Sequence, residues 1–259
     1  MDFKALAQKA SRTVYAVSSG QSGKNQGSGV SINTNGDLLT AAHVISKRAN
    51  KSREHIENIR VRDEKTQTST TEYEVMIPGL DVGMPHLASP ILLDIGYVRP
   101  KKPPSKPRAF LELSEADIEV GTEVLMAGFP EDVILPLDFL RLLDKDDPIV
   151  QEKLDEVIES NRQLMVKSGI IGNASPFSFD ASGGSISGQI FAVDNYMAKG
   201  ASGGPVVNSI GQIIGIIIEG SEIVSYVEGG TEIEIPIPSG ITYAISTRTI
   251  ATIRDLLYR

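Results

Sequence analysis

Apolar residues fall in many short runs separated by Gly, Asn and Ser, a pattern typical of strands joined by turns. We predict strands at Thr13–Val17, Gly29–Ile32, Asp37–Thr40, Ile59–Val61, Tyr73–Ile77, Ile95–Val98, Phe110–Leu113, Glu123–Ala127, Val166–Ile171, Ser187–Val193, Pro205–Val207, Gln212–Ile218 and Thr242–Ile245. Asn35-Gly36 lies between two runs and predicts a hairpin, since both residues tolerate positive φ. So many short strands favour an all-β barrel or sandwich over a parallel α/β sheet.

Helical periodicity is confined to three segments. At the N-terminus, one helical face collects Phe3, Leu6, Ala7 and Ala10. A helical insertion is predicted over residues 131–163, where Asp147 can cap a helix that has Pro148 at its first position. Apolar spacing predicts another helix over the C-terminal residues 249–259.

The Pro-rich segment Arg99–Arg108 divides the predicted strands into two groups. Proline-rich segments are stiff and extended, so this one suits a crossing between two lobes. We therefore predict two antiparallel barrels, the first over residues 13–108 and the second over residues 109–248. Lys101, Lys102, Lys106 and Arg108 fall in this linker, and we interpret them as solvated.

Composition narrows the function classes. The chain has 259 residues, 41% of them hydrophobic, and no apolar run approaches the roughly 20 residues that cross a bilayer. Charged residues interrupt the first fifteen positions, which is unlike a secretion signal. We expect a cytoplasmic protein without a membrane partner.

Charge and cysteine usage exclude further chemistries. The absence of cysteine rules out disulfides, thiolate metal sites and cysteine nucleophiles. A net charge of -8 argues against nucleic-acid binding. Histidine and carboxylate residues show no metal-ligand spacing, and the segment Gly20–Lys24 lacks the spacing of a phosphate-binding loop. We predict no metal and no cofactor.

The tetrapeptide ASGG occurs twice, in Ala181–Ser185 and Ala201–Pro205. Turn-forming residues surround Ser182, and a polar hairpin tip explains it. Glycines flank Ser202 on both sides before the chain enters apolar strands. Such a turn can point the N–H groups of Gly200 and Ser202 into one pocket, where they would bind a developing oxyanion. Ser202 is therefore the candidate nucleophile, and it requires a base to take its proton.

Three histidines are available as that base. His55 lies in a charged run, and His86 follows a proline in a predicted loop. His43 ends an apolar strand after Ala41 and Ala42, and such small residues let an imidazole lie against the backbone. His43 is the candidate base, although a core histidine would show the same pattern.

Two aspartates share the motif Asp-x-Gly, and one must orient the imidazole. Asp81 follows Pro78-Gly79 and is explained by a turn. Asp94 closes the apolar run Ile91–Leu93 and opens the alternating run Ile95–Val98. A carboxylate embedded in such strands needs a partner, because an isolated buried charge is very costly. Asp94 is therefore preferred over Asp81.

These motifs carry a family resemblance. In chain order, Thr40–His43, Asp94–Gly96 and Gly200–Pro205 resemble the motifs of chymotrypsin-like (trypsin-fold) serine proteases. Leu111–Pro130 and Gly240–Ile245 are similar to segments of the bacterial HtrA/Deg branch. Another class, an esterase on the α/β-hydrolase fold, fits poorly, because in that fold the serine precedes the aspartate and the histidine.

The resemblance implies two six-stranded barrels with a peptide-cleaving site between them. His43 and Asp94 would come from the first barrel, and Ser202 from the second. The N–H groups of Gly200 and Ser202 would form the oxyanion hole. The helical insertion, residues 131–163, would belong to the second barrel. The implied partner is a polypeptide substrate.

The chain also departs from the family. Ala201 stands where many members have an aspartate that pairs with a new N-terminus, so we expect no activation by such cleavage. No PDZ domain follows Leu257. These departures leave an alternative open, namely an inactive or partner-dependent binding module whose partner docks on the insertion, residues 131–163.

The resemblance also locates a specificity pocket. Tyr196 stands where trypsin-like enzymes place a carboxylate, Ile241 should narrow the same S1 pocket, and Gly220 should leave one wall open. This predicts cleavage after small or medium aliphatic residues. Tyr196 and Ile241 would equally suit the core.

Overall fold

The computed structural model describes residues 2–19, 25–45, 59–62, 70–82, 91–130, 163–181, 184–225 and 235–257. Its elements in chain order are α1 (Phe3–Ala10), β1 (Val14–Ser19), β2 (Asn25–Ser31), β3 (Leu38–Thr40), α2 (Ala42–Ile45), β4 (Ile59–Arg62), β5 (Thr70–Val82), β6 (Ile91–Pro100), β7 (Glu123–Gly128), β8 (Met165–Ala181), β9 (Gly184–Val193), β10 (Pro205–Val207), β11 (Ile213–Ser225), β12 (Ile235–Ser246) and α4 (Arg248–Leu257).

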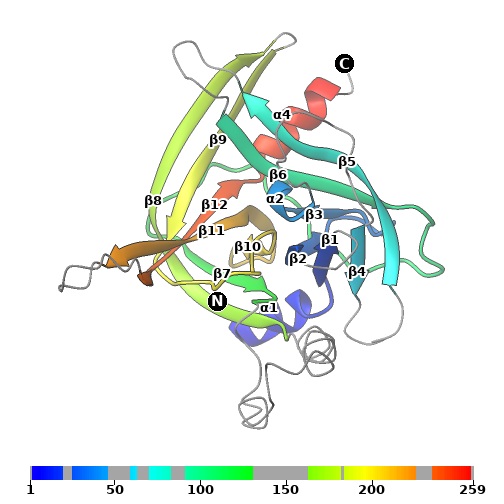
Figure 1. The fold of residues 1–259 in the computed structure, drawn as a ribbon, viewed down its shortest axis with the longest axis horizontal. Coiled ribbons are helices and arrows are strands. Elements are labelled where there is room, and N and C mark those ends of the chain that lie inside the picture. Colours follow the sequence, from blue (N-terminus) through cyan, green and yellow to red (C-terminus); the bar gives the residue numbers. More distant parts are fainter. Residues whose placement is uncertain are drawn as a thin grey trace.

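The strands close into two six-stranded antiparallel barrels (Figure 1). The first has the order β1-β2-β3-β6-β5-β4 and closes where β1 pairs with β4. The second has the order β10-β11-β12-β9-β8-β7 and closes where β10 pairs with β7. The prediction of an all-β fold built from two barrels is confirmed.

One predicted strand, Phe110–Leu113, is wrong. Leu113 forms only a single bridge, to Ile213. The backbone of this segment is shared between the barrels: Leu111 N donates to Ser31 O of β2 at 3.0 Å, and Ile213 N of β11 donates to Glu112 O at 2.8 Å. Because its hydrogen bonds go to two different sheets, the segment joins the barrels without belonging to either ladder.

A continuous apolar core holds the barrels together. Buried side chains from both barrels form one cluster, which includes Val30, Leu39, Leu125, Phe129 and Ile216. Each barrel also has its own interior, represented by Val17 and Leu38 in the first and by Val193 and Phe191 in the second. Apolar packing across the junction therefore joins the lobes that supply the site.

The helices lie against this core. Asp2 caps α1 by accepting a hydrogen bond from Ala5 N at 3.1 Å, and Leu6 and Ala10 pack on the inter-barrel cluster. Phe3, predicted on the same apolar face, is instead 39% exposed in the first turn. At the other end of the chain, α4 confirms the C-terminal helix and packs along β9. The predicted insertion at residues 131–163 lies outside the described residues, except for Gln163.

Three of the four basic residues in the linker, Lys101, Lys102 and Lys106, are exposed as predicted, and only Arg108 is partly buried. Lys101 is exposed and pairs with Glu72 at 3.2 Å. Arg108, in contrast, donates to Tyr73 Oη at 3.0 Å, and its guanidinium lies 5.2 Å from the centre of the Tyr15 ring. Cation–π stacking and hydrogen bonding thus fasten this residue to the first barrel.

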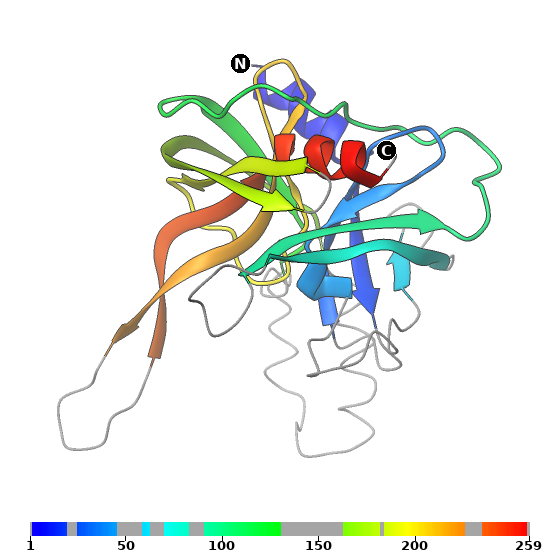
Figure 2. The same ribbon diagram turned by 90° about the horizontal axis from the view of Figure 1, so that it is seen from above.

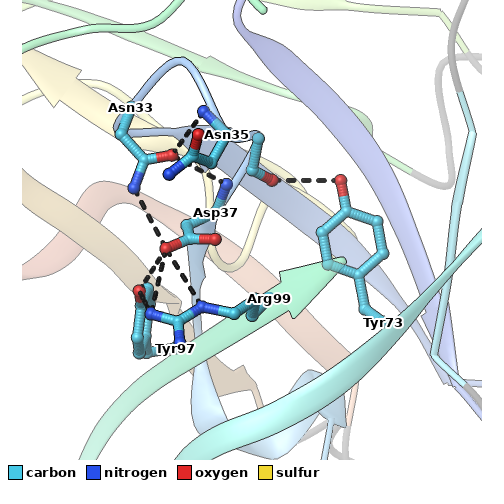
Figure 3. A network of polar contacts seen from close by, with 7 residues as sticks. Asn33, Asn35, Asp37, Tyr73, Tyr97 and Arg99 are labelled. Carbon is cyan, nitrogen blue, oxygen red and sulfur yellow. Dashed lines mark hydrogen bonds and ion pairs between the residues drawn. The ribbon is translucent and has the colours of Figure 1, made fainter. Parts of the chain in front are cut away.

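A buried polar network fastens the β2–β3 turn to β6 (Figure 3). Asp37 is 3% exposed, and its Oδ2 accepts hydrogen bonds from Asn33 Nδ2 at 3.0 Å, from Tyr97 Oη and from Arg99 at 3.4 Å. Burial, together with the bond to Asp37, raises the pKa of Tyr97 to about 12. β3 and β6 run from this network toward His43 and Asp94, so it stabilises the two strands that support them.

The predicted hairpin at Asn35-Gly36 is present as a turn rather than a two-residue loop. Ile32 N donates to Asp37 O at 3.0 Å, and Gly36 N donates to Asn33 O at 3.2 Å. Gly36 has φ +82°, which a glycine adopts without steric cost. Among the described helices, none is both long and apolar enough to span a bilayer.

Candidate active site

His43 and Asp94 are brought together from 51 positions apart in the sequence. His43 lies in the short helix α2 directly after β3, and Asp94 lies on β6, which pairs with β3. His43 N donates to Asp94 Oδ1 at 2.9 Å, and Nδ1 donates to Oδ2 at 2.6 Å. The two bonds use both carboxylate oxygens, so they hold the ring in one orientation and leave Nε2 for another partner.

The carboxylate also sets the proton affinity of the ring. The hydrogen bond to Asp94 raises the pKa of His43 above its ordinary value of 6.5, while burial works in the opposite direction. The charges of Asp94 and of Glu219 raise it further. His43 remains 49% exposed, so its free edge faces solvent.

The turn that carries Ser202 is hydrogen-bonded to both barrels. Ser28 N of β2 donates to Ser202 O at 2.7 Å, and Gly203 N donates to Ile217 O of β11 at 2.7 Å. Gly203 has φ +89°. A Cβ there would collide with Ser28 O and Thr40 Oγ1, so only glycine fits. The turn is therefore packed against β2 and the end of β3, just before His43.

Two N–H groups in this turn are left without an acceptor. Within the described part of the chain, Gly200 N and Ser202 N donate no hydrogen bond to protein, whereas Ala201 N, Gly203 N and Gly204 N all do. Gly200 has φ +92°. Unpaired backbone donors are rare and costly away from water, so this pair needs an acceptor from a ligand or solvent. An oxyanion hole has this donor arrangement.

The carbonyl of Gly200 is held from the other barrel. The fully buried Ser28 donates from Oγ to Gly200 O at 2.9 Å and accepts at Oγ from Phe129 N at 2.8 Å. Ser28 O in turn accepts from Thr40 Oγ1 at 2.6 Å. One side chain of the first barrel thus orients the peptide unit that follows Gly200.

Sequence reasoning did not single out Ser28 or Glu219. The available signal for Ser28 was its position between Gly27 and Gly29 at a predicted strand, where a small polar residue is unusual. Glu219 offered no signal, because an exposed glutamate in an apolar strand has an ordinary surface explanation.

Ala201 has a packing explanation. It is fully buried, and a Cβ on Gly128 at the end of β7 would lie 2.9 Å from both its Cα and its Cβ. Small residues at both positions let β7 approach the turn that carries Ser202 closely. A charged side chain at position 201 would be placed in this apolar contact.

The predicted S1 residues are partly assembled. A Cβ on Gly220 would lie 2.5 Å from Tyr196 Cε2, so the Tyr196 ring packs directly against this glycine. Thr242 clamps the loop that carries Tyr196, since its Oγ1 donates to Asn195 O at 2.7 Å and accepts from Met197 N at 2.8 Å. Ile241 is half-buried beside Thr242 on β12.

His43 Nε2 and Ser202 Oγ are not hydrogen-bonded to each other; within the described residues neither atom has a hydrogen-bond partner. The rejected candidates His55, His86 and Ser182 lie outside the described residues, as does the side chain of Asp81. No group of three or more histidine and carboxylate residues in the described ranges is suited to hold a metal ion.

The two barrels, with a histidine–aspartate pair on one and a glycine-flanked serine on the other, define the chymotrypsin-like protease class. The sequence profile of the trypsin-like peptidase domain matches residues 27–216, which is more than half of the chain. The chain belongs to this family. Whether it is nearer to the HtrA/Deg branch stays a prediction.

Solved structures with the same fold are distant in sequence. The chain is 14% identical to the Rv3671c protease from M. tuberculosis in its active form, with a TM-score of 0.57 over 97% of this chain and 83% of that one. The inactive form of the Rv3671c protease gives 14% identity and a TM-score of 0.56 over 97% and 92%. The MamO protease domain from Magnetospirillum magneticum in its apo form is 16% identical, with a TM-score of 0.54 over 95% of this chain and 98% of that one. No curated protein sequence matches the chain.

Proposed function

We propose that the protein is a serine endopeptidase in which Ser202 is the nucleophile, His43 the general base and Asp94 the residue that orients His43. The observation that carries this proposal is the two-point bond between His43 and Asp94, at 2.6 and 2.9 Å, on the barrel that contacts the Ser202 turn. An imidazole held in this way presents Nε2 as the only ring atom that can take a proton.

The proposed reaction has two stages. Ser202 Oγ attacks a peptide carbonyl while His43 Nε2 takes the hydroxyl proton, and the N–H groups of Gly200 and Ser202 bind the oxyanion. His43 then passes the proton to the leaving amine, which breaks the C–N bond and leaves an acyl group on Ser202. Water attacks this ester by the same route and restores the serine. Asp94 stabilises the charged imidazole in both stages.

An extended substrate has a strand edge available. β10 pairs with β11 as far as Ile216, and Ile217 then bonds to the nucleophile turn. Beyond it, no described strand pairs with Ile218–Gly220 on that side. A peptide that adds to this edge continues the ladder of β10 and brings its carbonyl toward Ser202, a common mode of peptide recognition.

We further propose that the attacked residue enters a pocket formed by Tyr196, Gly220 and Ile241, and that small or medium aliphatic side chains suit it best. The packing of the Tyr196 ring against Gly220 supports this, because it fills space that a long side chain would need. Cleavage after Arg as efficient as cleavage after Val or Ala in a peptide library would overturn this preference.

The nucleophile is tested by labelling with a fluorophosphonate, which modifies only activated serines. We expect one label, on Ser202, and loss of both labelling and peptide hydrolysis in Ser202→Ala. Ser209→Ala, on an exposed turn after β10, is the matched control and should keep both activities. Labelling elsewhere, or hydrolysis that survives Ser202→Ala, would refute the assignment.

A second candidate function is an inactive or partner-dependent module on the protease fold. It is favoured by the missing hydrogen bond between His43 and Ser202 among the described residues. A protein partner docking on residues 131–163 would suit this function. If Ser202 stays unlabelled in the folded protein, the inactive or partner-dependent module is favoured. Labelling of Ser202 in the isolated protein would exclude this second function.

A further inference from the structure

Glu219 lies beside the proposed substrate edge. It lies two residues after Ile217, which bonds to the turn that carries Ser202, and directly before Gly220, which packs on Tyr196. β11 also contacts β6, the strand that carries Asp94. In Figure 2, β11 and β12 leave the second barrel as a projecting pair of strands. The side chain is exposed.

The carboxylate of Glu219 has no neutralising partner in the described part of the chain, where it makes no hydrogen bond or ion pair. It is nevertheless close enough to His43 for its charge to raise the pKa of the imidazole. The Cβ position of the adjacent Gly220 points at Tyr196, so along the strand the Glu219 side chain points to the opposite face, away from the Tyr196 ring.

The sequence around Glu219 carries no positive charge. Residues 213–247 contain neither lysine nor arginine. A carboxylate without a neutralising partner attracts ligands of the opposite charge.

Strand geometry indicates which substrate residue meets Glu219. Successive side chains of an extended peptide point to opposite faces. If the attacked residue enters the pocket beside Tyr196, on the second barrel, the residue before it points toward the first barrel and His43. The Glu219 carboxylate lies on this side, within the influence it exerts on His43.

We propose that Glu219 selects substrates with lysine or arginine immediately before the residue whose carbonyl Ser202 attacks. This inference rests on the proposed endopeptidase function and adds a substrate class to it. Together with the aliphatic S1 pocket, it describes a preference for a basic residue followed by a small aliphatic one, with cleavage after the aliphatic residue.

The test uses a set of internally quenched peptides that differ at one position. Each has Val as the attacked residue and Lys, norleucine or Glu before it, so that norleucine supplies the lysine stem without charge. The enzymes are the wild type, Glu219→Gln and the control Glu123→Gln. Glu123 is exposed at the start of β7, whereas Gly128 at the end of that strand contacts Ala201. The control therefore loses the same charge away from the site.

In the wild type we expect kcat/KM for the Lys peptide to exceed that for the norleucine peptide by about fivefold, the upper range for an exposed ion pair, with the Glu peptide slowest. Glu219→Gln should bring the Lys-to-norleucine ratio close to one, and Glu123→Gln should keep the wild-type ratio. Salt at about 1 M should also reduce the wild-type Lys-to-norleucine ratio, because charges are then screened over about 3 Å. The ratio is taken within one enzyme, so an altered pKa of His43 cancels.

The outcomes separate this inference from the proposed function. A wild-type ratio near one, or a ratio that Glu219→Gln leaves intact, would overturn the role of Glu219 while Ser202 still reacts with the fluorophosphonate. If Ser202 stays unlabelled and none of the peptides is cleaved, the endopeptidase function fails and this inference fails with it.

Discussion

Replacing Ser28 with alanine removes a hydroxyl that connects the two barrels at the proposed oxyanion hole. The hydroxyl donates to Gly200 O at 2.9 Å and accepts from Phe129 N at 2.8 Å. Ser28→Ala keeps the backbone bonds of β2, including the one from Ser28 N to Ser202 O. The variant therefore tests the side chain separately from the strand.

The structure sets the size of the effect. Ser28 and Gly200 are buried, and Phe129 is 1% exposed, so water does not readily replace the lost partners. A buried backbone group left unsatisfied costs about 1–3 kcal/mol, and we expect a total loss of about 2–4 kcal/mol in the free energy of unfolding. A domain of typical stability, about 5–15 kcal/mol, stays folded after such a loss.

Reactivity should fall more than stability alone would require. Without the bond from Ser28, the peptide unit between Gly200 and Ala201 is held less firmly. This unit connects the two residues whose N–H groups, Gly200 N and Ser202 N, would bind the oxyanion, so both donors lose part of their support. Loss of one such donor lowers the rate by about 10²–10³-fold. We expect the fluorophosphonate labelling rate of Ser202 to fall by about 10- to 100-fold, because the donor is loosened and not deleted.

Ser31→Ala is the matched control. Ser31 lies on the same strand, is equally buried, and donates one bond from Oγ to Asn33 O at 3.2 Å. Urea unfolding should show a loss of about 1 kcal/mol for this variant, with wild-type labelling. Wild-type labelling in Ser28→Ala would refute the positioning role, and an equal loss of labelling in Ser31→Ala would assign the effect to general destabilisation.

Three further predictions concern the base, the turn and the distant network. The labelling rate should rise with pH with a midpoint above 6.5, because Asp94 raises the pKa of His43 and only the neutral ring accepts a proton. Asp94→Asn should lower that midpoint. A wild-type midpoint at or below 6.5 would contradict the geometry. Gly203→Ala, at φ +89° and in collision with Ser28 O, should abolish labelling and lower the unfolding midpoint in urea; an active, stable variant would disprove the packing. Tyr97→Phe removes one hydrogen-bond donor to Asp37 and should lower the free energy of unfolding by about 1–2 kcal/mol with the labelling rate unchanged. A slower labelling rate would contradict this and show that the network influences the site.

Strand positions were predictable where apolar residues recur, but strand lengths were not. β8 was predicted over Val166–Ile171 and extends to Ala181, and β11 was predicted over Gln212–Ile218 and extends to Ser225. Their outer halves are paired with β9 and β12 and contain polar residues and glycine. Such segments become strands because a neighbouring strand satisfies their backbone, which their own composition does not signal.

The candidate catalytic residues could be chosen from local context. His43 and Asp94 end or open apolar strands, and Ser202 lies in a glycine-rich turn. The hydrogen bonds that position the segments carrying these residues could not be predicted from local context. Ser28 and Gly200 are 172 positions apart, and no feature of either segment encodes the bond between them.

Residue order and composition were enough to define the two-barrel class and the three candidate side chains, because side-chain alternation and turn preferences act over a few neighbouring residues. The contacts of Ser28 with the nucleophile turn, of Arg108 with Tyr15, and the closeness of Glu219 to His43 arose only when the barrels packed together. Those relations depend on distances between atoms far apart in the chain, and only the closed and packed barrels set such distances.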